Sequence, residues 1–290
     1  MWVIIGHFRR ALWKSISHDT FTLAKAAAYS AILSLFPALL VTTTLLAISP
    51  RTAGLRREVR GAFDQVLPPD TMSLVQGYFQ DRHALTVKIV WSASVLSLLA
   101  AMGVMLSLLE GFRRAYELPR HLWGFWMTRW IALLLIPICL VPLALATLLI
   151  AFGRQIQLWM VSRADHELQS YVTIAWRMGR WAVALLTLMT VLATIYHFGT
   201  PRTQHWRRVL PGAVLAAFTW FLATLLYGGS VTRSAQYTAV YGSLAAGVAT
   251  LVWLYLTSLS VLIGAEFNAQ IFPKDEIAIR TEKEWDPAYE

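Results

Sequence analysis

Long apolar stretches alternate with short charged segments along the whole chain. Six stretches contain no Asp, Glu, Lys or Arg: 26–50, 89–109, 130–153, 181–201, 209–232 and 234–265. Each reaches the roughly 20 residues that an α-helix needs to cross about 30 Å of hydrocarbon. Only helices and closed barrels satisfy their backbone polar groups in lipid, and a barrel would show short alternating segments instead. The pattern therefore predicts six transmembrane helices.

The remaining charges suggest an orientation. The chain is 57% hydrophobic and 14% charged, with a net charge of +9, whereas an ordinary soluble domain carries about 25% charged residues. The short loops at 110–129 and 202–208 are rich in arginine, and basic loops stay on the cytoplasmic side of a membrane. With six crossings, both chain termini are then cytoplasmic. Such anchoring explains the basic balance without nucleic acid, so membrane lipids are the expected partners.

We predict an all-α, polytopic membrane protein with six transmembrane helices plus amphipathic interfacial helices. Residues 1–272 form one membrane domain, and residues 273–290 form an acidic cytoplasmic tail with three basic and six acidic side chains. The expected spans are about 27–49, 87–109, 130–152, 181–199, 209–229 and 241–265. Two amphipathic helices are expected at the outer surface within 51–88, on either side of Pro68–Pro69. The 154–180 segment is expected to be interfacial as well.

The N-terminal segment predicts a further amphipathic helix. Large apolar side chains recur there at helical spacing: Trp2, Ile5, Phe8, Leu12 and Ile16. Arg9, Arg10 and Lys14 lie elsewhere around the turn. Two interpretations fit this pattern: a helix lying on an anionic membrane surface, or a solvated helix leading into the first span. The apolar residues precede the arginines, which is the reverse of the order in a signal peptide.

Residues for catalysis or metal binding form no motif that we can identify. The single cysteine, Cys139, lies within an apolar stretch, which favours a packing role. The seven histidines are scattered and have no metal-ligand spacing, and common enzyme motifs are missing. We predict no catalytic residue, no metal and no cofactor, and we do not expect an enzyme.

Polar residues inside the first span are candidate functional residues, because such residues are costly in lipid. Tyr29 and Ser34 lie at small helical offsets, and Pro37 sits near the middle of the stretch. Proline removes a backbone hydrogen bond and commonly kinks a helix. Two interpretations remain: a kinked helix that only packs, or a break in the helix that faces a ligand.

Carboxylates stand where the second and sixth spans meet the cytoplasmic face. Glu110 precedes Arg113 and Arg114 by three and four residues, which predicts a salt bridge within the helix. Glu266 should lie at the same depth, where a charge costs less than the roughly 3 kcal/mol it costs at the centre of a span. A pair with Lys25, or with an arginine that follows the second span, would tie the helices together. Alternatively, the same cluster would form a cytoplasmic gate or a headgroup site.

The last span combines small residues with polar residues at both ends. Tyr241 fits either an aromatic belt at the membrane interface or the outer entrance of a cavity. Gly242, Ala246 and Thr250 recur at every fourth residue, which favours close helix packing. Asn268 lies in the final apolar turn.

Three sequence blocks resemble the YihY/BrkB family of bacterial inner-membrane proteins. They are AAAYSAILSLFPALL at 26–40, WRRVLPGAVLAAFTWFL at 206–222 and YGSLAAGVATLVWLYLTSLSVLIGAEFNAQ at 241–270. The resemblance implies six spans and an inner-membrane location. It also implies that the following positions are typical of the family: Tyr29, Ser34, Pro37, Pro211, Gly212, Tyr241, Gly242, Trp253, Glu266 and Asn268. Lys25 departs from the small residue usual in the family, and Phe267 replaces a usual leucine.

The predicted function is that of a transporter or lipid-handling protein, with a small molecule, an ion or a lipid as substrate. Binding or gating is assigned to Tyr29, Ser34, Pro37, Glu110, Arg113, Tyr241, Gly242, Trp253, Glu266 and Asn268. The alternative is a structural or scaffold protein in which these residues only lock helices together. Members of the resembling family have carried a ribonuclease label, and one branch a virulence-factor name. A ribonuclease is the distant third reading, because a metal-dependent nuclease needs clustered ligands. A homo-oligomer is left open.

Overall fold

The computed structural model describes residues 2–47, 87–119, 123–161, 169–200, 205–233 and 245–272 of the chain. These residues form helices and no strands: α1 (Trp2–Ser17), α2 (Thr20–Ala47), α5 (Val87–Ala115), α6 (Phe125–Val161), α7 (Gln169–Phe198), α8 (Trp206–Arg233) and α10 (Ala245–Ile271). Each helix except α1 contains an apolar stretch long enough to cross a membrane. The predicted all-α architecture with six spans is confirmed.

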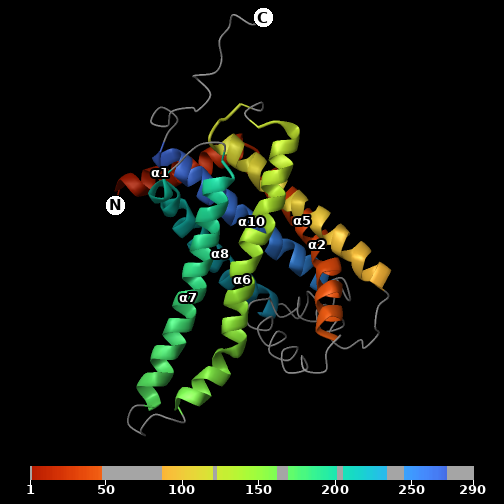
Figure 1. Ribbon diagram of the computed structural model, residues 1–290. Helices are drawn as coiled ribbons and strands as arrows, with labels where there is room; N and C mark the ends of the chain where they lie inside the picture. The colour runs from red at the N-terminus through yellow and green to blue at the C-terminus, as the bar shows by residue number, and fades with distance from the viewer. Residues whose placement is uncertain are drawn as a thin grey trace, which may run out of the picture.

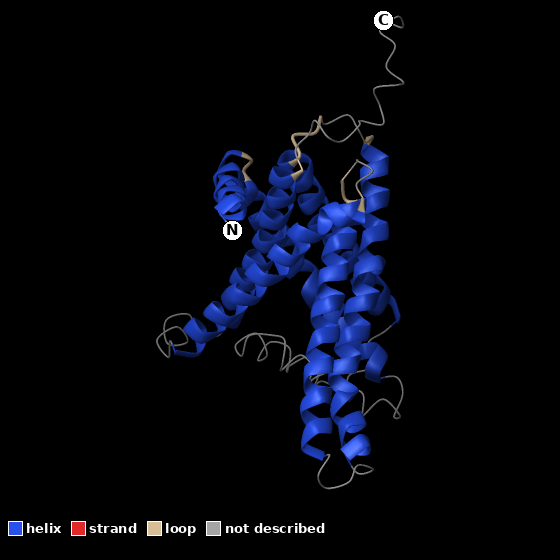
Figure 2. Cartoon of the chain, turned by 90° about the vertical axis from the view of Figure 1, so that its left-hand side faces the viewer, coloured by secondary structure: helices blue, strands red, loops and turns tan. Residues whose placement is uncertain are grey.

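The helices pack in pairs, and α10 contacts most of the others. α2 packs against α5, α6 against α7 and α8 against α10, while α10 also contacts α1, α2 and α5. α6 and α7 form a long hairpin, and α1 lies at the end of the molecule opposite the tip of this hairpin (Figure 1). The side view shows that the helices gather at the α1 end and spread apart toward the other end (Figure 2).

The buried core lies at the α1 end, where the helices converge. Phe112 near the end of α5, Leu135 in α6 and Tyr196 near the end of α7 are among its largest fully buried side chains. Val209 at the start of α8 and Leu262 toward the end of α10 complete this group. Elsewhere, α6, α7 and α8 turn many large apolar side chains out of the protein, as helices that face lipid do. The buried core therefore holds the helices together at the end of the bundle where the charged residues lie.

The small-residue face of α10 is buried as predicted. Ala249 and Thr250 are fully buried and Ala246 nearly so. The Tyr227 hydroxyl of α8 donates a hydrogen bond to the Ala249 carbonyl at 3.0 Å. Small side chains at this spacing let the two helix backbones approach closely.

The described parts of the predicted interfacial segment 154–180 continue two long helices, whose span-length apolar stretches end at Leu149 and begin at Thr173. α6 continues to Val161 and α7 begins at Gln169, so the described parts of 154–180 extend these helices. A charge-free stretch underestimates helix length, because arginine side chains near helix ends reach the membrane surface with their charged groups. The helices predicted within 51–88 fall almost wholly outside the described residues, and so does the tail at 273–290.

Candidate functional site

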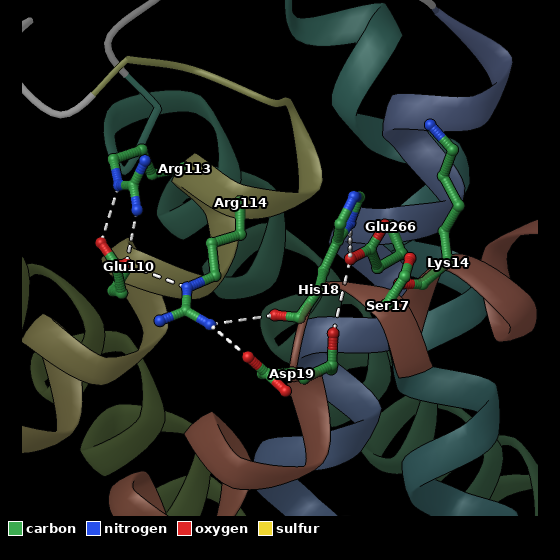
Figure 3. Close-up of polar contacts among 9 residues, drawn as sticks. Lys14, Ser17, His18, Asp19, Glu110, Arg113, Arg114 and Glu266 are labelled. Carbon is green, nitrogen blue, oxygen red and sulfur yellow. Dashed lines mark hydrogen bonds and ion pairs between the residues drawn. The ribbon is translucent and has the colours of Figure 1, made fainter.

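Ionisable and polar side chains from three parts of the chain meet at the α1 end. We call this group the polar cluster; its members are Lys14, His18, Asp19, Thr20, Glu110, Arg113, Arg114, Glu117 and Glu266. They come from the α1–α2 junction, from the end of α5 and from the last turns of α10. Figure 3 shows Glu110 and its arginines on one side, and His18 with Glu266 on the other.

Glu266 is the most deeply buried carboxylate of the polar cluster, with 1% of its surface exposed. Its Oε1 lies 2.8 Å from Nδ1 of His18, and the Thr20 hydroxyl donates to the same oxygen at 3.4 Å. This contact is a hydrogen bond in which either the imidazole or the carboxyl group donates the proton. The other oxygen, Oε2, is buried and has no hydrogen-bond partner among the described residues. An unsatisfied buried acceptor costs about 1–3 kcal/mol, so this oxygen requires an explanation.

A tight turn between α1 and α2 places His18 beside the buried carboxylate. Only His18 and Asp19 separate the two helices, and Asp19 has a left-handed φ of 55°. The Asp19 N–H donates to the Ile16 carbonyl, and the Asp19 carbonyl accepts from the N–H groups of Thr22 and Leu23. One residue therefore terminates α1 and starts α2, as residues in this conformation commonly do at helix ends.

Glu110 has partners on both of its oxygens, and all of them are on its own helix. Arg113 donates to Oε1 at 2.6 Å and to Oε2 at 2.7 Å, and Arg114 donates to Oε1 at 3.0 Å. The predicted salt bridge within the helix is therefore present. Paired arginine–carboxylate bonds of this kind are strong and directional. Arg114 also donates to Oδ2 of Asp19 at 3.1 Å, which ties α5 to the α1–α2 turn.

The end of α5 brings a third carboxylate to the polar cluster. Glu117 has a left-handed φ of 50°, and the N–H groups of Glu117 and Leu118 return to carbonyls of the last helical turn, as in a Schellman motif. The Glu117 carboxylate lies 2.6 Å from Nζ of Lys14 and 3.9 Å from Nε2 of His18. His18 thus stands between a half-exposed carboxylate and a fully buried one.

Asn268 is fully buried and clamps the end of α10 to the start of α8. Its Oδ1 accepts from the Gly212 N–H at 2.6 Å, and its Nδ2 donates to the Val209 carbonyl at 3.0 Å. Pro211 lies between these two residues and has no N–H of its own. Because α8 begins at Trp206, this proline lies past the first turn. The side-chain amide of Asn268 therefore hydrogen-bonds to backbone groups of α8 on both sides of the proline.

Two glycines allow the close approach of α8 and α10. A Cβ on Gly212 would overlap the Gly264 carbonyl and the Asn268 side chain, and a Cβ on Gly264 would overlap the Tyr196 hydroxyl. This hydroxyl donates to the Val261 carbonyl at 2.6 Å. The two helices are thus in backbone contact where the clamp forms.

Three of the ten predicted binding or gating residues belong to the polar cluster: Glu110, Arg113 and Glu266. Asn268 lies close to Glu266 in the chain, but its side chain binds α8. Two more predicted residues lie outside the described part of the chain: Tyr241 and Gly242.

The other four predicted residues do not join this site. Tyr29 is 62% exposed on the outside of α2. Ser34 donates to a carbonyl of its own helix at 2.8 Å, and Pro37 lies within the same helix. Trp253 donates from Nε1 to the Thr224 hydroxyl at 3.3 Å and so links α10 to α8.

Both partners predicted for Glu266 are wrong, because His18 occupies that position. Lys25 is exposed, and the arginines at the end of α5 bind Glu110 instead. Lys25 follows Thr20 by five residues, which turns it about 140° around α2 away from the carboxylate. Sequence reasoning missed the role of the α1–α2 junction. The available signal was the His18–Asp19 pair, two ionisable residues at the membrane depth expected for Glu266, directly before the first span.

Most of the chain is similar in sequence to known bacterial proteins. Residues 12–285 match the sequence profile of the family described as virulence factor BrkB. A Bacillus subtilis (strain 168) protein, YfkH, whose name calls it ribonuclease-like, is 28% identical over 254 residues, covering 86% of this chain and 89% of that protein. A UPF0761 membrane protein of Tolumonas auensis is 28% identical over 276 residues, covering 91% of this chain and 85% of that protein.

A further UPF0761 membrane protein, from Alkalilimnicola ehrlichii, is 29% identical over 250 residues, which are 84% of this chain and 53% of that protein. No solved structure matches the chain. The profile match covers nearly all of the chain, so the resemblance found in the three sequence blocks is confirmed. The chain belongs to the virulence factor BrkB family, and it is a multi-pass membrane protein.

Proposed function

We propose that the protein is a transporter or a lipid-handling protein of the bacterial inner membrane, and that Glu266 is its binding or gating group. In this proposal the α1 end faces the cytoplasm, as the arginine-rich loops favour. The observation that carries it is Oε2 of Glu266, a buried oxygen with no partner among the residues that the structure describes, in a helix long enough to cross a membrane. Ionisable residues in such helices commonly mark pathways for substrates, ions or protons.

The two carboxylates of the polar cluster that lie on spanning helices provide an internal comparison. Both oxygens of Glu110 are occupied by arginine N–H groups, which suits a side chain that holds a helix end in place. Glu266 uses one oxygen for His18, and the described ranges of the chain offer no partner to the other. An ionised carboxylate only accepts hydrogen bonds, so the free oxygen suits a proton, an ammonium group or another cation.

His18 supplies a connection between the Glu266 carboxylate, through Oε1, and the surface. Its two ring nitrogens lie 2.8 Å from Glu266 and 3.9 Å from Glu117. The exposed fractions of the side chains rise from 1% for Glu266 to 17% for His18 and 49% for Glu117. An imidazole beside two carboxylates can take a proton on one nitrogen and release one from the other. This arrangement supports binding or transport that is linked to protonation of Glu266.

A scaffold protein without a transport cycle is the second candidate. The clamp made by Asn268 and the bond from Arg114 to Asp19 favour it, because both tie helices together. In this reading the His18–Glu266 pair is one more tie, between the α1–α2 junction and α10.

A ribonuclease is the third candidate, and the name of the Bacillus subtilis relative is what favours it. Within the described ranges, no group of three or more His, Cys, Asp or Glu side chains is placed to hold a metal ion. RNA cleavage that requires a divalent metal and survives rigorous purification would establish this function.

Native mass spectrometry of the protein released from lipid nanodiscs tests the proposal. Wild type is expected to retain a discrete lipid or metabolite, and Glu266→Gln is expected to lose it while staying folded. Glutamine keeps the size of the side chain and an acceptor for His18, but it removes the negative charge. Glu110→Gln is the matched control and is expected to retain the ligand. If wild type and both variants emerge without a ligand, the scaffold reading replaces the proposal.

A further inference from the structure

The second half of α1 packs on the protein through small residues and turns its large apolar residues outward. Ala11 and Ser15, one turn apart, are fully buried. Trp13 and Ile16 are 75% and 62% exposed. An amphipathic helix that docks onto a protein core normally buries its large apolar side chains. The reversed arrangement in α1 indicates that its outward face meets a second apolar medium.

The same outward face carries positive charge that no acidic residue of α1 offsets. An open groove of about 540 Å³ runs along it, lined by Arg9, Arg10, Leu12, Trp13, Lys14, Ile16 and Gln270. Arg9 and Arg10 are exposed, and none of the described residues that line the groove is acidic. A groove that combines guanidinium groups with an indole and aliphatic side chains is complementary to a molecule that has both an anionic and an apolar part.

The orientation of α1 suits a molecule that stands in the bilayer. α1 lies crosswise to α6 and α7 at the end of the bundle (Figure 1), and the side view agrees because it looks nearly along α1 (Figure 2). A helix crosswise to the spans lies in the plane of the membrane surface. At that depth arginine reaches lipid phosphates, and tryptophan sits at the boundary with the hydrocarbon.

We infer that this groove is a discrete site for one anionic phospholipid. Its phosphate lies between Arg9 and Arg10, and an acyl chain lies against Trp13 and Ile16. If lipid binding came only from general attraction to an anionic membrane, each exposed cation at the α1 end would contribute equally to it. Binding at a discrete site depends instead on the two arginines of the groove. The site uses no atom of Glu266, so it does not rest on the proposed transport function.

The test is lipid retention by the full-length protein from nanodiscs of phosphatidylcholine that contain a minority of phosphatidylglycerol. Wild type is expected to keep phosphatidylglycerol selectively after release into the mass spectrometer. The double variant Arg9→Gln/Arg10→Gln is expected to bind it about 30-fold more weakly, because it removes the two basic contacts to the lipid phosphate, at about 1 kcal/mol each. Arg9→Lys/Arg10→Lys is expected to keep most of the binding.

The matched control is Lys25→Gln/Arg207→Gln, which removes the same charge from exposed residues outside the groove. It is expected to retain phosphatidylglycerol like wild type. If the two glutamine variants lost equal amounts of phosphatidylglycerol, general electrostatic attraction would explain the binding and the inference would be overturned. Retention by Arg9→Gln/Arg10→Gln at the level of wild type would overturn it as well. Displacement of the lipid by glycerol phosphate in water would assign the groove to a soluble phosphate ligand instead.

Discussion

The polar residues at the α1 end differ in whether each of their polar side-chain atoms has a hydrogen-bond partner. Both oxygens of Glu110 and both polar side-chain atoms of Asn268 have hydrogen-bond partners. Glu266 is as deeply buried as Asn268, but its Oε2 has no partner in the described part of the chain. Buried polar groups in proteins are nearly always satisfied. Among the polar cluster and Asn268, this exception makes Glu266 the residue on which the proposed function depends.

The contact between α8 and α10 depends on the absence of a side chain at residue 212. Gly212→Ala is expected to destabilise the protein, because the new Cβ would overlap the Gly264 carbonyl and the Asn268 side chain. Overpacking of this kind typically costs about 1–3 kcal/mol. The measurement is the midpoint of thermal unfolding in one detergent. Gly179→Ala, at a site with open space around it, is the control, and equal midpoints for the two variants would contradict the contact.

At the scale of elements, the α1–α2 turn connects three helices, α1, α2 and α5. Asp19 ends α1 and starts α2 with its backbone, and its side chain accepts a hydrogen bond from Arg114 of α5. The same turn sets the position of His18 beside Glu266. A change in this turn therefore acts on helix ends, on the attachment of α5 and on the buried carboxylate together.

Substitutions at Asp19 are expected to separate the strain of the turn from the loss of the ion pair. Asp19→Ala and Asp19→Gly both remove the bond to Arg114, but alanine must still adopt the left-handed conformation seen here. That conformation costs an alanine about 1–2 kcal/mol and a glycine almost nothing. Asp19→Gly should therefore unfold at a higher temperature than Asp19→Ala, with Asp19→Asn above both. A midpoint for Asp19→Ala at or above that of Asp19→Gly would show that the turn is not strained in this way.

The spans were predictable from the sequence, but the contacts between them were not. Charge-free stretches of sufficient length identify membrane helices because lipid excludes charge. The depth of Glu266 followed from the same pattern. Its partner depended on how far α2 is rotated about its axis, and a single sequence leaves that rotation undetermined. The sequence therefore offers Lys25 or an arginine after the second span as the partner, and does not single out His18, although His18 also stands near the start of the first span.

At the scale of the whole molecule, the polar cluster lies where the bundle is packed most tightly. The helices converge at the α1 end and spread apart at the other end (Figure 2), and the buried core follows the convergent end. α1 is placed so that its outward face carries the groove and its last residues lead to His18. Movement of α1 on the membrane surface would therefore change the surroundings of Glu266, which links the proposed lipid site to the proposed binding site.

The most direct measurement compares the thermal unfolding midpoints of Glu266→Gln and Glu110→Gln with that of wild type, after bound ligands have been removed. Glu110→Gln is expected to lower the midpoint by several degrees, because hydrogen bonds to charged groups contribute about 1.5–3 kcal/mol. Glu266→Gln is expected to leave it unchanged or raise it, because the glutamine amide can hydrogen-bond Nδ1 of His18 as acceptor or as donor and buries no charge. A drop for Glu266→Gln as large as that for Glu110→Gln would make Glu266 a tie between helices and contradict its role as a binding group.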